Sequence, residues 1–172
     1  ENGTRRPLIV SGQSINKNEK IMDAPVEMID IYPTLMDLTG KKTPSFVSGK
    51  SFASLLKDSS KRVRKSALTE LIIGSKDKMV QGYSIKTNRY RLTQWGENGV
   101  YGYELYDHKF DKPELNNLAN EEAYRALKDS LKKVIRDRIA DARKIPDGIG
   151  QQNIPKETGE PKPIYSQPKS KF

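Results

Sequence analysis

The feature that most constrains this fold is an aromatic stretch, residues 79–117, in which apolar and polar side chains alternate between tight turns. It holds Trp95, the only tryptophan, and five of the eight tyrosines. Alternation with a period of two is typical of β-strands, and it predicts strands at residues 80–86, 89–95 and 103–107.

Short connections separate these segments, as in a run of β-hairpins. Thr87 and Asn88 form the predicted turn between the first two, and a glycine-rich loop follows the second. Residues 67–73 mix apolar and β-branched side chains and predict one more strand before the hairpin. The sequence therefore predicts a small antiparallel sheet of about four strands.

A long amphipathic helix is predicted after the strands, at residues 121–143. Asn120 suits the N-cap, and glutamates follow in the first turn, where the helix dipole favours negative charge. One apolar stripe runs along the helix and consists of Tyr124, Leu127, Leu131, Val134, Ile135 and Ile139. We expect this stripe to pack across one face of the sheet.

The residues before the sheet predict an α/β arrangement. Residues 7–12 form an apolar run closed by glycine, which is typical of a buried strand. Residues 26–40 predict a helix whose apolar stripe faces the core. That stripe consists of Met28, Ile31, Tyr32, Leu35 and Leu38. A short helix is predicted at residues 51–57, and its inward side chains are Phe52, Leu55 and Leu56.

These elements divide the chain into three parts. Residues 1–65 read as the end of an α/β domain, and residues 66–143 as a subdomain of antiparallel sheet plus long helix, an α+β unit. Residues 144–172 are rich in proline and lysine and predict an extended or disordered tail. The chain opens at Glu1 without a methionine or a signal peptide, so we expect it to be part of a longer protein.

Composition excludes several kinds of site. The chain has no cysteine and a single histidine, His108, so a thiol nucleophile and a multi-histidine metal site are ruled out. No apolar run approaches the roughly 20 residues that a membrane span needs. The net charge of +9 suggests an anionic partner, although dispersed surface lysines and arginines explain it equally well.

Several segments, in this order and spacing, resemble the C-terminal part of the alkaline-phosphatase-like sulfatases. They are GTRRPLIV at residues 3–10, VEMIDIYPTL at 26–35 with the glycine at 40, and GKSF at 49–52. The later motifs YSIKT, YRLT, ELYD and PELNNL, within residues 83–118, resemble the iduronate-2-sulfatase branch. The resemblance covers residues 1–143.

The resemblance implies an exported enzyme, periplasmic, extracellular or lysosomal, that hydrolyses sulfate esters of a sulfated carbohydrate. Such enzymes use a formylglycine and a divalent cation, usually calcium. The formylglycine motif, Cys or Ser followed by x-Pro-x-Arg, does not occur here. We therefore expect no catalytic or metal-binding residue in this segment, which alone should be inactive. Its expected partner is the N-terminal sulfatase domain or chain.

The resemblance places the small sheet beside the catalytic cleft, where basic and aromatic side chains could contact an anionic sugar. The candidate substrate-binding residues are Lys86, Arg89, Arg91 and Trp95. Each has a simpler explanation. Lys86 and Arg89 flank a turn, where cations are usually solvated, Arg91 could form a salt bridge, and Trp95 could seal a contact between the sheet and the main domain.

Two other functions remain open from the sequence. The chain could be a basic binding module for a polyanion, either a heparin-like polysaccharide or nucleic acid, although no nucleic-acid motif occurs and nucleic acid is therefore an unlikely partner. It could also be a structural subdomain whose apolar strand and helix pack against another chain.

Overall fold

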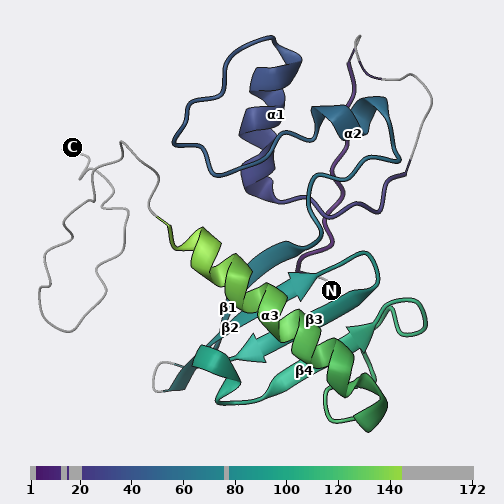
Figure 1. Ribbon diagram of the computed structural model, residues 1–172, viewed down its shortest axis with the longest axis vertical. Coiled ribbons are helices and arrows are strands. Elements are labelled where there is room, and N and C mark those ends of the chain that lie inside the picture. Colours follow the sequence, from purple (N-terminus) through teal and green to yellow (C-terminus); the bar gives the residue numbers. More distant parts are fainter. Residues whose placement is uncertain (1–2, 13–14, 16–20, 76–77, 145–172) are drawn as a thin grey trace, which may run out of the picture.

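The computed structural model describes residues 3–12, 15, 21–75 and 78–144, and its centre is a four-stranded antiparallel sheet (Figure 1). The strands lie side by side in chain order as β1 (Ala67–Ser75), β2 (Lys78–Lys86), β3 (Tyr90–Trp95) and β4 (Tyr103–Asp107). Each strand pairs with the next one along the chain, so short connections suffice. The predicted sheet is confirmed.

The register divides the sheet into an apolar face and a polar face. Ile85 lies opposite Leu92, which lies opposite Leu105 on the next strand, and all three are fully buried at 0% exposure. One position away, Arg91 lies opposite Tyr106. Because successive side chains of a strand point to opposite faces, this polar pair lies on the other side of the sheet.

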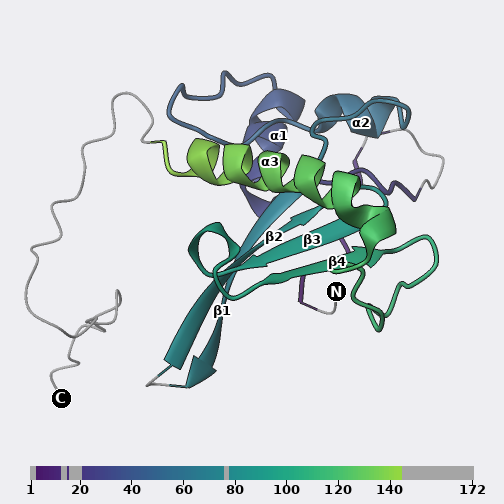
Figure 2. The same ribbon diagram turned by 60° about the horizontal axis from the view of Figure 1, so that its bottom comes forward.

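The long helix α3 (Arg125–Ala142) crosses the apolar face of the sheet (Figures 1 and 2). Leu131, Ile135 and Ile139 from this helix enter one buried cluster with the apolar residues of β2, β3 and β4. The other three members of the predicted stripe, Tyr124, Leu127 and Val134, pack against the same cluster. The predicted covering of the sheet by a C-terminal helix is confirmed.

The start of this helix differs from the prediction. A short 3-10 turn, η3 (Glu122–Tyr124), precedes α3, and Tyr124 occupies the N-cap position of α3. Asn120 caps neither element, because a turn closed by the bond from the Glu121 N–H to the Leu118 carbonyl comes first.

A second, smaller unit of helices lies beside the sheet (Figure 1). It contains η1 (Met28–Asp30), α1 (Ile31–Leu38) and α2 (Ala53–Lys57). Phe52, Leu55 and Leu56 are buried together, as predicted, with Ile31 and Leu38 packed against them. This unit has its own apolar cluster, but the predicted division of the chain near residues 65 and 143 stays a prediction.

Two predictions for the first 40 residues were wrong. Residues 7–12 form no strand within the described part of the chain, and Ile9 is 88% exposed. A strand exists only when a neighbouring strand satisfies its backbone, and no described segment pairs with this one. The stripe of residues 26–40 is also only partly buried. Met28 is 81% exposed, and Tyr32 and Leu35 are exposed as well.

The turn of the central hairpin is shifted by one residue from its predicted place. The Thr87 N–H donates to the Tyr90 carbonyl at 2.8 Å, so these two residues close the turn around Asn88 and Arg89. The Thr87 hydroxyl accepts the Tyr90 N–H at 2.8 Å and satisfies the second backbone group. This side-chain contact, which the sequence pattern does not encode, fixes the shift.

Residues 145–172, which cover nearly all of the predicted tail, lie outside the described residues. Among the helices that the structure does describe, none is long and apolar enough to cross a membrane.

Candidate functional site

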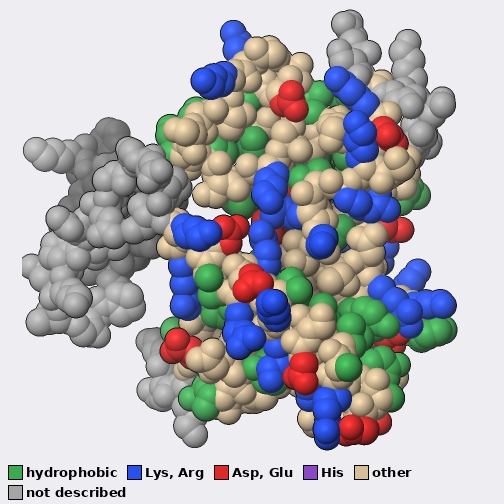
Figure 3. All heavy atoms as spheres, viewed as in Figure 1, with side chains coloured by type: hydrophobic (Ala, Val, Ile, Leu, Met, Phe, Trp, Pro, Cys, Tyr) green, Lys and Arg blue, Asp and Glu red, His purple; other side chains and the backbone are tan. Residues whose placement is uncertain are grey.

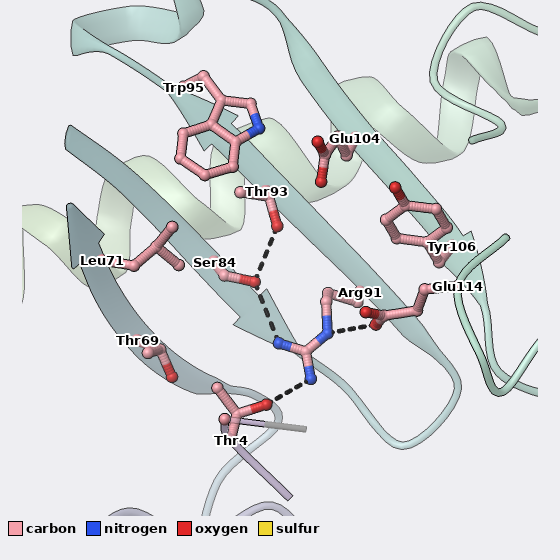
Figure 4. A pocket seen from close by; sticks show the side chains of 11 residues that line it. Thr4, Thr69, Leu71, Ser84, Arg91, Thr93, Trp95, Glu104, Tyr106 and Glu114 are labelled. Carbon is pink, nitrogen blue, oxygen red and sulfur yellow. Dashed lines mark hydrogen bonds and ion pairs between the residues drawn. The ribbon is translucent and has the colours of Figure 1, made fainter. Parts of the chain in front are cut away.

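A hollow of about 390 Å³ opens on the polar face of the sheet, opposite α3 (Figure 4). Its lining is rich in hydroxyl groups, which come from Thr4, Thr69, Ser84 and Thr93. Its aromatic and charged side chains are Trp95, Tyr106, Arg91, Glu104 and Glu114. The strands supply most of this lining because alternate residues of β1, β2, β3 and β4 point to the polar face.

Arg91 is the central residue of the hollow and is only 6% exposed. Its Nε lies 2.6 Å from the Glu114 carboxylate, and one terminal nitrogen donates to Thr4 Oγ1 at 2.8 Å. The other terminal nitrogen donates to Ser84 Oγ at 3.3 Å. These contacts fix the guanidinium and tie both the N-terminal segment and the loop after β4 to the sheet (Figure 4).

The loop after β4 places Glu114 in the lining of the hollow. Both carboxylate oxygens of Asp111 accept backbone N–H groups, from Leu115 at 3.0 Å and from Asn116 at 2.8 Å. Glu114 itself adopts a positive φ of 62°, a conformation that this tight loop imposes. Its carboxylate also lies 2.7 Å from His108 Nε2, so Arg91 and His108 contact the same oxygen.

Trp95 lies against the backbone of β2 at Gly82. A Cβ atom at Gly82 would lie 2.7 Å from two carbons of the indole ring, closer than real contacts allow. Glycine at this position therefore permits the indole to rest on the strand at the edge of the hollow.

The four predicted substrate-binding residues separate into two pairs. Arg91 and Trp95 line the same hollow. The Lys86 ammonium instead folds onto the turn and donates to the Thr87 carbonyl at 2.7 Å. Arg89 also lies outside the hollow. Whether any of the four binds substrate stays a prediction.

Arg89 is held by a carboxylate of the neighbouring strand. It donates two hydrogen bonds to Asp107, at 2.7 and 2.6 Å, and its guanidinium lies 4.8 Å from the Tyr90 ring centre. The hydrogen bonds from Arg89 hold the pKa of the Asp107 carboxyl below its ordinary value. The pair connects the hairpin turn to the end of β4.

A second cavity, of about 350 Å³, lies between the end of α3, the start of β1 and the helical unit. Two of its arginines face the Glu27 carboxylate. Arg64 contacts Glu27 at 2.7 Å, and Arg138 contacts the other oxygen of Glu27 at 2.6 Å. Lysine and arginine side chains are spread over the face shown in Figure 3, with acidic side chains among them.

Within the described ranges, no group of three or more His, Cys, Asp or Glu residues could hold a metal ion. The sequence has no cysteine to serve as a formylglycine precursor. The residues of this part of the chain therefore do not fit the metal and aldehyde chemistry that the resemblance implies.

Sequence reasoning missed several residues of the hollow. Glu104 and Tyr106 could have been found, because the period-two pattern of residues 103–107 and antiparallel pairing of β3 with β4 place them beside Thr93 and Arg91. Thr4 and Glu114 had no such signal. They reach the hollow through contacts far apart in sequence, which no local pattern encodes.

Comparison with known proteins places the chain among the sulfatases. Residues 1–141 match the family model described as N-sulphoglucosamine sulphohydrolase, C-terminal. The chain belongs to this family and represents the C-terminal part of a sulfatase, as its motifs predicted.

Individual relatives agree with this assignment. A sulfatase of Formosa agariphila is 31% identical over 135 residues, which cover 78% of this chain and 24% of the relative. A Delta 4,5-hexuronate-2-O-sulfatase of Bacteroides thetaiotaomicron is 31% identical over 124 residues, covering 70% of this chain and 25% of the relative. This second relative gives loose support to the resemblance to iduronate-2-sulfatases. The chain thus spans about a quarter of the length of these curated relatives.

Solved sulfatase structures share the fold. The structure of a 2-O GAG sulfatase superimposes with a TM-score of 0.65 at 28% identity, covering 76% of this chain and 28% of that one. A sulfatase from Bacteroides thetaiotaomicron superimposes with a TM-score of 0.56 at 29% identity, covering 64% and 24%. These similarities confirm the predicted fold class.

Proposed function

We propose that this chain completes a sulfatase that hydrolyses sulfate esters of a sulfated carbohydrate. The observation that carries the proposal is the family match over residues 1–141, which includes every strand of the sheet and nearly all of α3. In this proposal the segment completes the fold and forms part of the substrate-cleft wall, while the catalytic centre belongs to the rest of the enzyme.

Two relatives support a glycosaminoglycan-type substrate with sulfate on a uronic acid. The Bacteroides thetaiotaomicron relative is named a Delta 4,5-hexuronate-2-O-sulfatase. The solved structure that superimposes with a TM-score of 0.65 is described as a 2-O GAG sulfatase. A third, more distant structure, at 25% identity and a TM-score of 0.50, contains the substrate D-glucosamine-2-N,6-O-disulfate. We infer a sulfated disaccharide as the substrate, with the 2-O position of a hexuronate as the site of cleavage.

The partner of this segment is the N-terminal sulfatase domain. Apolar side chains on the N-terminal segment and the helical unit are exposed here, among them Ile9, Met28 and Leu35. Exposed apolar residues in this number are typical of a surface that another part of the protein covers. The N-terminal domain would bury these side chains and supply a neighbour for the backbone of residues 7–12.

The same domain would provide the formylglycine and a divalent cation, calcium by family resemblance. Such a cation polarises the oxygens of a sulfate ester, and the hydrated aldehyde supplies the nucleophile. An exported location is part of the proposal and also follows from the family.

The proposal is tested by sulfate release from a 2-O-sulfated hexuronate disaccharide. We expect the complete enzyme to release sulfate and the 172-residue chain alone to release none. Sulfate release by the chain alone would place the catalytic centre in this segment, and no release by the complete enzyme from any sulfated disaccharide would remove the proposed activity.

A further inference from the structure

The described residues that line the hollow on the polar face of the sheet include two carboxylates and one guanidinium, although the chain as a whole is basic. Arg91, the one lysine or arginine among the described lining residues, contacts Glu114 at 2.6 Å. Glu104 is a second carboxylate of the lining, and it forms no ion pair with any residue that the structure describes. Among the described lining side chains, one arginine and two glutamates give a formal charge of −1.

Tyr106 lies beside Glu104 in the lining of the hollow. Burial raises the pKa of its phenol, and the neighbouring Glu104 carboxylate raises it further. The phenol therefore keeps its proton at neutral pH and donates it in a hydrogen bond to the Glu104 carboxylate.

A negative potential in a partly enclosed site disfavours another anion, because bringing like charges together costs free energy. The lining suits a neutral, hydroxyl-rich ligand instead. The carboxylate of Glu104 accepts hydrogen bonds, the Thr69 hydroxyl can donate or accept them, the Tyr106 hydroxyl can accept them, and Trp95 offers a flat apolar surface. A volume of about 390 Å³ accommodates a small ligand.

The geometry points to this hollow as a subsite for an uncharged sugar ring that neighbours the sulfated ring of the substrate. This inference rests on the proposed function. Glu104 accepts a ring hydroxyl, Trp95 contacts the apolar face of the ring, and Arg91 is a hydrogen-bond donor that Glu114 holds in place. The sulfate group binds elsewhere, which differs from the expectation that basic residues here select anionic groups.

The direction in which KM changes in a Glu104 variant distinguishes an uncharged sugar ring in the hollow from an anionic group. The probe is a disaccharide of N-acetylglucosamine and 2-O-sulfated hexuronate, assayed with the complete enzyme. We expect Glu104→Gln to raise KM about tenfold, because a charged hydrogen-bond acceptor is lost. Glu97→Gln, which changes an exposed glutamate of the short 3-10 turn η2 (Glu97–Gly99), is the matched control and should not change KM.

A lower KM in Glu104→Gln would show that an anion occupies the hollow, because a repelling charge has been removed, and it would overturn the inference. An unchanged KM would overturn it too. Trp95→Ala should raise KM for the same disaccharide, and its melting temperature shows whether the fold is retained. If Trp95→Ala does not fold, the KM of Glu104→Gln alone tests the proposed sugar subsite.

A binding measurement separates failure of the subsite from failure of the proposed activity. The methyl glycoside of N-acetylglucosamine, which carries no charge, is titrated calorimetrically into the complete protein. We expect binding that Glu104→Gln weakens about tenfold. No binding by the wild type, or equal binding by both proteins, would overturn the subsite. This result does not depend on sulfate release.

Discussion

Arg89 and Arg91 are two residues apart and have opposite surroundings. Arg91 points from β3 into the hollow and is 6% exposed, whereas Arg89 lies in the turn and contacts Asp107 on β4. The difference follows from the shift of the turn, which removes Arg89 from the strand. A shift of one residue in the turn thus decides whether an arginine lines the hollow or forms a salt bridge that stabilises the fold.

The Arg89 pair makes stability depend on acid pH. Asp107 is 2% exposed, and hydrogen bonds from Arg89 lower its folded-state pKa below the ordinary carboxyl value. The carboxylate therefore stabilises the fold above the unfolded-state pKa, and this contribution is lost as pH falls through the lowered folded-state pKa. We expect Arg89→Gln to lower the melting temperature at neutral pH, with the difference from wild type shrinking in acid.

The measurement is thermal unfolding between about pH 2 and pH 7. Arg125→Gln is the control, because its partner Glu122 is exposed and such surface pairs contribute little. A difference between Arg89→Gln and the wild type that stays constant down to the lowest pH would contradict the assigned role of Asp107.

Among the elements, those with strong periodicity were predicted well from the sequence. The four strands and the long helix each carry a pattern that matches a face of the observed core. The prediction of a buried stripe in α1 failed for a physical reason. Its apolar residues have the right spacing, but periodicity shows only which side chains share a face and not whether the chain itself contains the surface that covers them.

Of the candidate site, the sequence predicted the two residues that occupy one strand, Arg91 and Trp95. Their alternation on β3 places both on the polar face. The sequence could not show that Glu114 neutralises Arg91 or that Asp107 binds Arg89, because those contacts depend on how loops and neighbouring strands meet.

The packing of α3 on the sheet is tested at Ile135, which has 0% exposure and lies in the core of α3, β2, β3 and β4. Ile135→Ala removes buried methylene and methyl groups and leaves a cavity, so we expect a loss of roughly 2–5 kcal/mol in the free energy of unfolding. Chemical denaturation measures the loss. Lys133→Ala on the exposed side of the helix should stay within about 0.5 kcal/mol of the wild type. Equal effects of both substitutions would contradict this packing.

For the whole molecule, one buried arginine joins the helical unit to the sheet. Arg64 donates from Nε to Asp30 at 3.0 Å and from a terminal nitrogen to Asp30 as well, while its other terminal nitrogen contacts Glu27 at 2.7 Å. Glu27 in turn accepts the Leu68 N–H of β1 at 2.7 Å and binds Arg138 of α3 at 2.6 Å. A single network therefore spans η1, β1 and α3.

This network predicts that the two units unfold together. Asp30 has 0% exposure, so Arg64→Gln leaves a buried carboxylate without its counter-charge, and we expect a loss of roughly 3–5 kcal/mol. Arg62→Gln is the matched control, because Arg62 is exposed and its contacts within the described part of the chain are hydrogen bonds to the carbonyls of residues 59–61. Chemical denaturation followed by Trp95 fluorescence, which reports on the sheet, and by circular dichroism, which reports on the helices, should give coincident midpoints in the wild type. A fluorescence midpoint unchanged by Arg64→Gln would mean that the sheet folds independently of the helical unit, and that Arg64 does not link them.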